Sequence, residues 1–229
     1  MTALKIIRIV AWGAIVMLGG LVVGFSGLLP RNEQLPTAGN VARSGVVAIG
    51  GPFELTTHKG QTFSNVDVAG KPYLMFFGFT RCPDVCPTTL TELSSLMEEL
   101  GSDADRVTPL FVTVDSERDN QQTLAEYMTA FDRRIIGLRG TPEQTDAAVK
   151  AYKAYYKKVP LEGGDYTIDH TAGVFLMSAD GRFIGKLDMH EPRETRVAKL
   201  RRLVKKQSLK LEDSRSPDRT IMWAVLLLA

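Results

Sequence analysis

The stretch KPYLMFFGFTRCPDVCPTTLTELSSLMEELG, at residues 71–101, decides the fold of this chain. It opens with an almost wholly apolar run over 73–79, which is typical of a strand buried on both faces. From Pro87, apolar residues recur at helical spacing until Gly101 ends the pattern. The stretch therefore predicts a central strand, a turn and a helix, and both cysteines of the chain lie in that turn.

The segments after this unit repeat the order of strand and helix. An apolar run at 107–114 precedes a helical pattern over 124–131, so the two strands are expected to be parallel. Further along, the pattern predicts a short strand, a capped helix, an antiparallel hairpin around an Asp-Gly turn and a basic helix. These elements are expected at 135–138, 141–155, 171–187 and 196–206, with Ala148, Tyr152 and Tyr155 on the capped helix.

Two further strands are expected before the central strand, within 51–65, because apolar residues alternate on both sides of a turn. With two cysteines where the central strand meets its helix, this order resembles an α/β thioredoxin-like fold. The fold would carry an added N-terminal hairpin and an inserted strand–helix pair. The domain is expected at 50–207, and 208–229 is left as a tail whose apolar end is too short to cross a membrane.

The residues before the domain predict a membrane anchor. Residues 9–29 are uncharged, and a helix of that length, at about 1.5 Å per residue, matches a hydrocarbon core of about 30 Å. Two basic residues precede this span, which places 1–8 in the cytoplasm and the domain outside it, facing the periplasm in a bacterium. Residues 30–49 have the composition of a linker. A cleaved signal peptide is the alternative, but no Ala-x-Ala follows the long apolar stretch.

Composition limits the possible functions. The 229 residues include 28 Lys and Arg against 26 Asp and Glu, a net charge of +2, so the chain lacks the strong positive charge of a nucleic-acid-binding protein. Two cysteines cannot form a disulfide scaffold. With only three histidines in addition, any metal site must be small.

Cys82 and Cys86 are separated by three residues at the start of the expected helix. This spacing places both sulfurs on one side of the turn, where free N–H groups and the helix dipole favour thiolate. A thiolate serves both as a metal ligand and as a nucleophile. The alternative is a structural disulfide or two inert thiols, although a disulfide that closes so short a loop constrains little chain. The spacing also differs from the Cys-x-x-Cys of the usual redox motif.

His170 is the candidate third ligand. It lies at the expected start of the strand after the inserted helix, at the sheet edge that approaches the cysteine turn in a thioredoxin-like fold. Oxidoreductases of that fold commonly carry a cis-proline there, but this chain has no proline between Pro160 and Pro192. An imidazole beside two thiolates predicts a metal site. The other histidines, His58 and His190, are expected on the surface.

Four segments together resemble the Sco family, whose members are membrane-anchored copper proteins of cytochrome c oxidase assembly. They are GFTRCPDVCP at 78–87, VDSERD at 114–119, IGLRGT at 136–141 and DHT at 169–171. The resemblance extends over about 50–207, and the paired cysteines with a distant Asp-His-Thr are its most specific part.

The resemblance implies a metallochaperone that binds one copper ion per chain, as Cu(I) or Cu(II), through Cys82, Cys86 and His170. Its partner would be cytochrome c oxidase subunit II, whose binuclear copper centre it helps to metallate, and an upstream copper donor would load it. The donor chemistry agrees, because thiolates select Cu(I) and an imidazole stabilises Cu(II). Structural zinc normally has four protein ligands, and the sequence offers three. Asp84 and Asp169 are expected to cap turns beside the site.

Two enzymatic hypotheses stand beside copper transfer. The cysteines could cycle between dithiol and disulfide and reduce the copper-ligand cysteines of subunit II, as a thiol-disulfide oxidoreductase. A thiol peroxidase is the weaker hypothesis, because such enzymes usually place Pro and Thr before the reactive cysteine, whereas Phe79-Thr80-Arg81 precedes Cys82. Only copper holding needs His170, so the imidazole distinguishes copper transfer from thiol exchange.

Overall fold

Strand β3 (Tyr73–Gly78) is the centre of the domain in a computed structural model of the chain, which describes residues 48–215 and their side chains as far as residue 205. All six residues of β3 are buried, as the apolar run predicts. The strand pairs in parallel with β4 (Thr108–Thr113) and antiparallel with β8 (Val174–Met177). It therefore has no free edge.

Several expected segments lie outside the described residues. They are the cytoplasmic segment 1–8, the membrane anchor 9–29, the linker as far as residue 47, and residues 216–229 of the tail. Among residues 48–215, no helix combines the length and the apolar character that a membrane span requires. The last helix, α5 (Arg193–Arg215), continues past the expected domain end at 207 into the expected tail.

The main sheet has seven strands in the order β2-β1-β5-β4-β3-β8-β9. Strands β3, β4 and β5 are parallel, and the antiparallel hairpins β1–β2 and β8–β9 extend the two sides of the sheet. Both hairpins confirm the expectation from their turn residues. The remaining bounds are β1 Glu54–Thr57, β2 Thr62–Ser64, β5 Ile136–Arg139 and β9 Phe183–Leu187.

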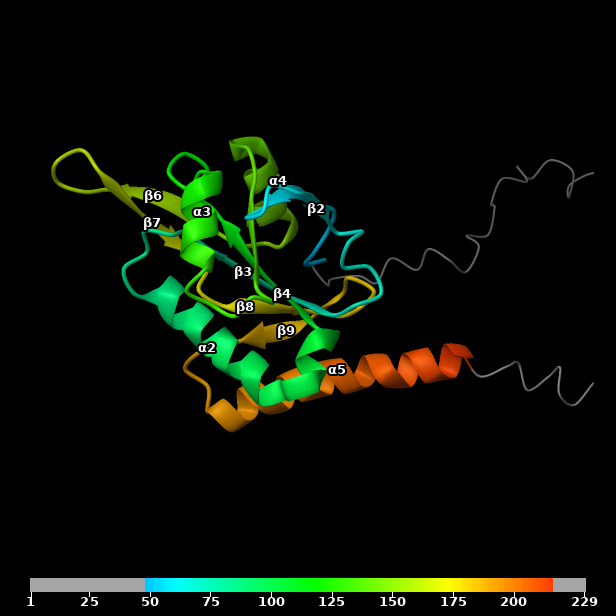
Figure 1. The fold of residues 1–229 in the computed structure, drawn as a ribbon. Coiled ribbons are helices and arrows are strands. Elements are labelled where there is room, and N and C mark those ends of the chain that lie inside the picture. The colour runs from blue at the N-terminus through cyan, green and yellow to red at the C-terminus, as the bar shows by residue number, and fades with distance from the viewer. Residues whose placement is uncertain (1–47, 216–229) are drawn as a thin grey trace, which may run out of the picture. The chain divides into compact units, whose positions relative to one another are not determined.

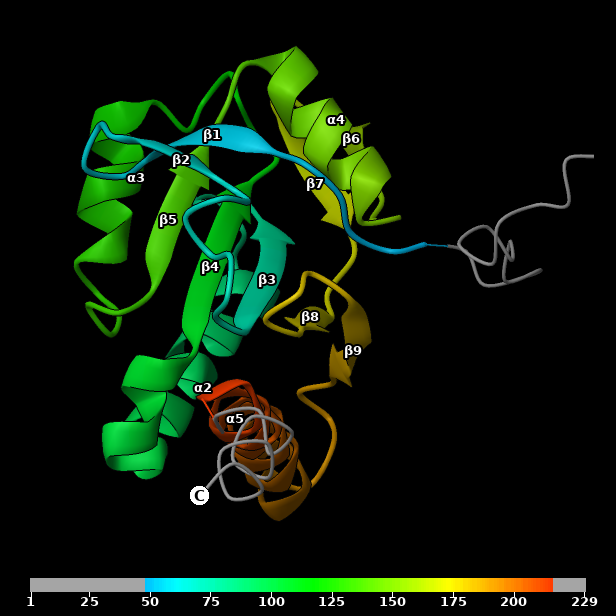
Figure 2. The same ribbon diagram turned by 90° about the vertical axis from the view of Figure 1, so that its right-hand side faces the viewer.

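The helices connect these strands in the order that a thioredoxin-like fold requires, β3-α2-β4-α3-β8-β9-α5, with β5 and α4 as the expected inserted strand–helix pair. Figures 1 and 2 both show α2 and α5 side by side, while α4 lies near β1. The bounds are α2 Val85–Leu100, the 3-10 turn η1 Gly101–Arg106, α3 Gln121–Met128 and α4 Pro142–Ala151.

Three element boundaries differ from the expectation. Helix α2 begins at Val85, so Cys86 is already helical. Helix α4 ends at Ala151, and Tyr155 is not on it, because Lys153 adopts a positive φ of 53° that stops the helix. The strand expected from residue 171 begins at Val174. The residues just before it connect to a different strand, which ends at His170.

That strand belongs to a second, two-stranded sheet that the sequence analysis missed. The sheet consists of β6 (Tyr156–Pro160) and β7 (Tyr166–His170), and it projects from the body of the domain in Figure 1. The turn between the strands contains Gly163 and Gly164, both with positive φ. Most residues of β6 are exposed, so the hairpin lacks the alternation of apolar and polar residues that identifies a half-buried strand.

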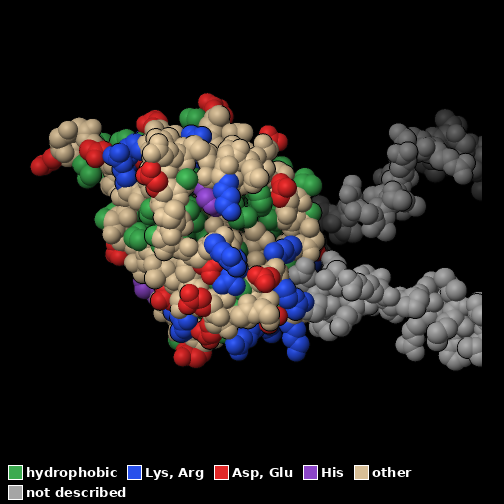
Figure 3. Space-filling view, viewed as in Figure 1, with side chains coloured by type: hydrophobic (Ala, Val, Ile, Leu, Met, Phe, Trp, Pro, Cys, Tyr) green, Lys and Arg blue, Asp and Glu red, His purple; other side chains and the backbone are tan. Residues whose placement is uncertain are grey.

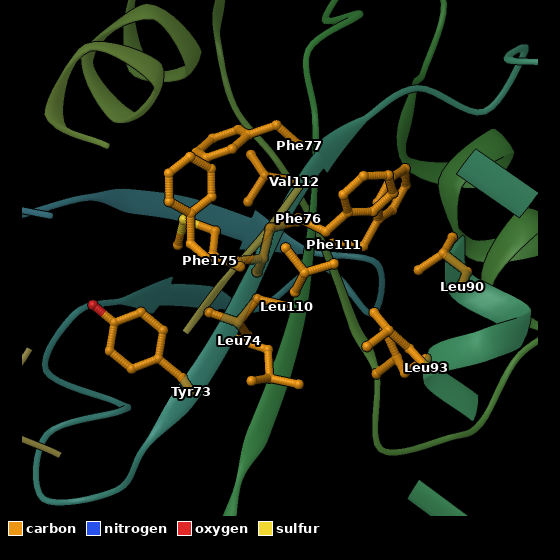
Figure 4. Packing of buried hydrophobic residues seen from close by; sticks show 14 of the residues in the cluster. Tyr73, Leu74, Phe76, Phe77, Leu90, Leu93, Leu110, Phe111, Val112 and Phe175 are labelled. Atoms are coloured by element: carbon orange, nitrogen blue, oxygen red, sulfur yellow. The ribbon is translucent and has the colours of Figure 1, made fainter. Parts of the chain in front are cut away.

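Aromatic packing on both faces of β3 places α2 at the carboxyl end of this strand. On one face, Phe76 packs against Phe111 with a ring-centroid distance of 5.9 Å, and Leu90 of α2 lies close by in Figure 4. On the other face, Phe77 packs edge-on against Phe175, also at 5.9 Å. The turn that carries the cysteines is thus held by the packed core at both ends, through β3 before it and α2 after it.

Candidate metal centre

Cys82 and Cys86 lie where β3 gives way to α2, as the sequence predicts. Cys86 is in the first turn of α2 and is wholly buried, whereas Cys82 lies in the preceding turn and is partly exposed. Gly78, the last residue of β3, makes room for this arrangement. A Cβ atom at Gly78 would lie only 2.6 Å from the Cys86 sulfur, so any larger residue would displace that sulfur.

His170, the last residue of β7, brings its imidazole to the two sulfurs. Its Nε2 lies 3.4 Å from Cys86 Sγ, and one ligand atom from each of the three residues lies within 4.8 Å of the other two. Nδ1 donates to the carbonyl oxygen of Thr171 at 3.2 Å, which leaves the lone pair on Nε2. The rings of Phe76 and Phe79 pack edge-on against the imidazole and hold its plane.

The two thiols differ in acidity. The hydrogen bond from the Cys86 thiol, aided by N–H groups at the start of α2, lowers the pKa of Cys82 to about 4. The same contact with Cys82, together with burial, raises the pKa of Cys86. In the metal-free protein, Cys82 is therefore the thiolate and Cys86 keeps its proton. The expectation of two thiolates is wrong for this state, because two like charges in contact, one of them buried, repel each other.

The other two histidines do not join the cluster. His190 is exposed, as expected, with its side chain 97% accessible and Nδ1 2.8 Å from an oxygen of Asp188. His58 is partly buried, which corrects the expectation of a surface residue. Its Nδ1 accepts a hydrogen bond from the Gly137 N–H at 3.1 Å, and burial lowers its pKa. His58 thus ties the β1–β2 turn to β5.

Neither candidate aspartate is among the clustered donors. Among the described residues, Cys82, Cys86 and His170 form the one group of three or more side chains that could hold a metal ion. Asp84 precedes α2 and accepts a hydrogen bond from the Thr88 hydroxyl at 3.3 Å, but its side chain caps no backbone N–H of the helix, so the expected capping role is not confirmed. Asp169 is an exposed residue of β7 and does not cap a turn, because the missed hairpin places it in a strand.

A buried carboxylate holds the segment that precedes Cys82. Asp119 accepts hydrogen bonds from the N–H and the hydroxyl of Thr80, at 2.9 and 2.6 Å, and from the hydroxyl of Thr113 at the end of β4. These contacts fasten Thr80, two residues before Cys82, to the end of β4 and the loop that follows it. The sequence alone does not predict this role of Asp119, because its partners, Thr80 and Thr113, belong to two different segments that only the fold brings together.

Arg118 connects the loop after β4 to the hairpin that carries His170. Its Nε lies 2.6 Å from Asp115 Oδ2, and its Nη1 donates to the Tyr166 carbonyl at 2.7 Å and to Asp165 at 2.8 Å. The guanidinium also lies 3.6 Å from the centre of the Tyr166 ring, whose hydroxyl donates to Asp115 at 2.8 Å. Tyr166 begins β7 and His170 ends it, so these contacts position the imidazole.

A sequence profile of the SCO1/SenC family matches residues 41–205, which is more than half of the chain and includes the whole Cys-Cys-His cluster. The chain belongs to the SCO1/SenC family. This membership confirms the family resemblance of the sequence motifs.

Relatives of this SCO1/SenC member occur in bacteria and in mitochondria. Protein SenC of Rhodobacter capsulatus is 35% identical over 188 residues, which cover 82% of this chain and 83% of SenC. The mitochondrial SCO1 homologue of Homo sapiens is 36% identical over 169 residues, which cover 72% of this chain and 56% of that protein. The chain spans about half the length of the mitochondrial SCO1 homologues that it matches.

Solved structures share the fold. Bradyrhizobium japonicum ScoI with copper bound is 45% identical and has a TM-score of 0.65, over 68% of this chain and 99% of ScoI. BsSco, a Sco-family protein with an identified disulfide switch, has a TM-score of 0.56 over 69% of this chain and 94% of BsSco; at 21% identity this likeness shows the fold alone. The thioredoxin-like α/β fold is thus confirmed.

The acidity of Cys82 can be measured by alkylation of the reduced, metal-free chain. We expect iodoacetamide to modify Cys82 first, at a rate that is nearly constant above about pH 5 and falls below about pH 4, because a thiolate reacts and a thiol does not. Peptide mass spectrometry identifies the modified residue. Cys86→Ala should raise the pKa of Cys82 toward its ordinary value, because it removes the hydrogen bond that lowers it most. Equal rates for both cysteines at neutral pH would contradict the assignment.

The role of Arg118 can be tested by amide hydrogen exchange. Arg118→Ala should speed exchange across β7 by at least about ten-fold and shift the His170 imidazole resonances, because it leaves Asp115 buried beside an unsupported hairpin. Arg118→Lys keeps the charge but not the forked contacts, so its effect should be intermediate. Arg133→Ala, at an exposed arginine, is the matched control. Unchanged exchange in Arg118→Ala would show that the hairpin is held by other contacts.

Proposed function

We propose that this chain is a membrane-anchored copper metallochaperone that serves the binuclear copper centre of cytochrome c oxidase subunit II. The observation that carries the proposal is the convergence of Cys82, Cys86 and His170 within 4.8 Å of one another. Two sulfurs and one imidazole suit both Cu(I) and Cu(II), and the copper-bound state of the related ScoI supports copper as the metal. One copper ion per chain would be the cargo.

Loading would begin at Cys82, the partly exposed thiolate that an upstream copper donor can reach. Cys86 must then lose its proton, whereas His170 already presents a free lone pair because its Nδ1 carries the proton. Each copper ion taken up would therefore release one proton from Cys86. The apparent affinity for copper should accordingly rise with pH.

Delivery would also begin at Cys82. Three protein ligands leave room at the metal for an incoming ligand, so a cysteine thiolate of subunit II can bind copper while the chaperone still holds it. The partly exposed Cys82 is the sulfur ligand that such a thiolate can replace first, and the buried Cys86, together with His170, would retain the ion until the second exchange. Copper would then never be free in solution.

The proposed membrane tether at 9–29 places the domain outside the cytoplasm, on the periplasmic side in a bacterium. The uncharged stretch and the basic residues before it support this arrangement. Because subunit II is itself a membrane protein, a tether would raise the effective concentration of the two partners without any new contact.

The unequal thiols also favour a second candidate function, thiol-disulfide exchange with subunit II. The Cys82 thiolate would attack a disulfide between the copper-ligand cysteines and form a mixed disulfide, and Cys86, once deprotonated, would displace the second partner thiolate. The partner is reduced and the Cys82–Cys86 pair is oxidised, so an external dithiol must restore the pair.

Replacement of His170 separates the two functions. His170→Ala should lose the sulfur-to-copper charge-transfer absorption of the Cu(II) form and most Cu(II) affinity, because one of three ligands is gone. Exchange of the Cys82–Cys86 pair with a model disulfide should persist. His190→Ala, at an exposed histidine, is the matched control and should bind one copper ion per chain. Full oxidase assembly by His170→Ala would favour thiol exchange, and uptake of zinc without copper would overturn the chaperone proposal.

The tether can be tested by replacing residues 1–29 with a cleavable export signal. The exported chain should bind copper normally, because all three ligands lie far downstream, but should support oxidase assembly only at higher expression. A reporter fused after Gly50 of the full chain should be active only if it works outside the cytoplasm. N-terminal sequencing that finds mature protein beginning beyond residue 29 would show cleavage instead of a tether.

A further inference from the structure

A groove of about 660 Å³ lies between the β8–β9 hairpin and α5, and its lining is basic. Its floor contains Leu176, Ile184 and Leu203, and Ile184 is 44% exposed although it is a large apolar residue. Figure 3 shows several Lys and Arg side chains, with Asp and Glu side chains among them, over the region where Figure 1 places β9 and α5. The basic groove, as we call it, is lined by Arg182, Lys186, Lys199, Arg202 and Lys205 together with Asp180.

The basic groove carries more positive charge than its own acidic neighbours balance. Arg182 pairs with Asp180, and Lys199 pairs with Glu191. Of the other three cations, Arg202 and Lys205 form no ion pair with any residue whose side chain the structure describes. The Lys186 Nζ instead lies 4.6 Å from the centre of the Phe175 ring. A concave surface with unbalanced cations above an apolar floor suits a ligand with an anionic head and an apolar part.

The chain enters the domain beside this groove. A Cβ atom built on Gly50 would lie 3.2 Å from the carbonyl oxygen of Gly181, and Gly181 belongs to the turn whose neighbours Asp180 and Arg182 line the groove. The expected linker before the domain ends here. A linker of the length expected from the sequence would have an end-to-end distance of only about 25 Å.

The groove and the candidate metal centre lie at opposite ends of one strand. Pro72, immediately before β3, lines the groove, whereas Gly78, the last residue of β3, contacts Cys86. A strand of this length separates its ends by about 20 Å. A surface that binds at the groove would therefore leave the cysteines facing away from it.

We propose that the basic groove binds the anionic phospholipid headgroups of the membrane that carries the tether. This inference rests on the membrane tether of the proposed function. Arg202 and Lys205 would contact lipid phosphates, and Ile184 would contact the apolar boundary beside them. The linker keeps the groove within reach of the bilayer, which favours lipid over an acidic protein that must be recruited. Docking would orient the copper site toward the extramembrane domain of a partner.

The test uses the full chain in lipid nanodiscs made either of phosphatidylcholine alone or with about one third phosphatidylglycerol. Acetylation of lysines, read by mass spectrometry, should be about five-fold slower or more at Lys205 in the anionic discs. Lys59 and Lys150, which are exposed elsewhere, should be labelled equally in both. Addition of about 0.5 M salt should remove the protection, because it shortens the screening length to about 4 Å.

A charge-reversed variant provides the second arm. Arg202→Glu and Lys205→Glu together should abolish the lipid-dependent slowing of amide exchange across 178–187, whereas Arg133→Glu and Lys150→Glu together, at exposed positions elsewhere, should keep it. Both variants should still bind one copper ion, which separates this inference from the copper proposal. Equal labelling in both lipids, or protection that requires an added acidic protein, would overturn lipid docking. A chain that does not co-elute with nanodiscs would refute the tether itself.

Discussion

Close packing of α2 against the carboxyl end of β3 is the constraint on which the site depends. The absence of a side chain at Gly78 lets the Cys86 sulfur sit against the strand backbone, and the contact between Phe76 and Phe111 keeps that end of the sheet filled. The Cys86 sulfur is therefore packed in place and shielded from solvent. The other ligands must come to it, Cys82 through a turn held by Asp119 and His170 through a hairpin held by Arg118.

The difference in burial between the two sulfurs has chemical consequences. Because the thiols share one hydrogen bond, ionisation of Cys82 is favoured at the expense of Cys86. An ion or a disulfide therefore meets a reactive, accessible sulfur first and a protected one second. This order suits both stepwise copper transfer and thiol exchange, which explains why the same residues support two functional hypotheses. His170, which only copper binding needs, is the residue at which the two hypotheses differ.

The domain is also polarised along its central strand. The candidate metal ligands gather where β3 ends, and the basic groove lies beside its beginning, near the point where the chain enters the domain. This arrangement would suit the tethered carrier that we propose, because the end nearest the proposed tether would face the membrane and the opposite end would remain open to a partner. Both properties follow from a single buried strand that connects the two ends rigidly.

The sequence by itself determined the elements that rest on local patterns. The apolar run of β3, the helical spacing in α2 and the Asp-Gly turn of β8–β9 predicted the central layer, and the paired cysteines with His170 predicted the metal-ligating set, because residue type and spacing carry that information. Only the tertiary structure decided the rest. Most residues of β6 are exposed, so the β6–β7 hairpin has no alternation of apolar and polar residues from which a strand could be predicted. The roles of Asp119 and Arg118 depend on partners that the fold brings together from distant segments. The unequal acidity of the thiols likewise arises from burial and contact, which spacing alone cannot express.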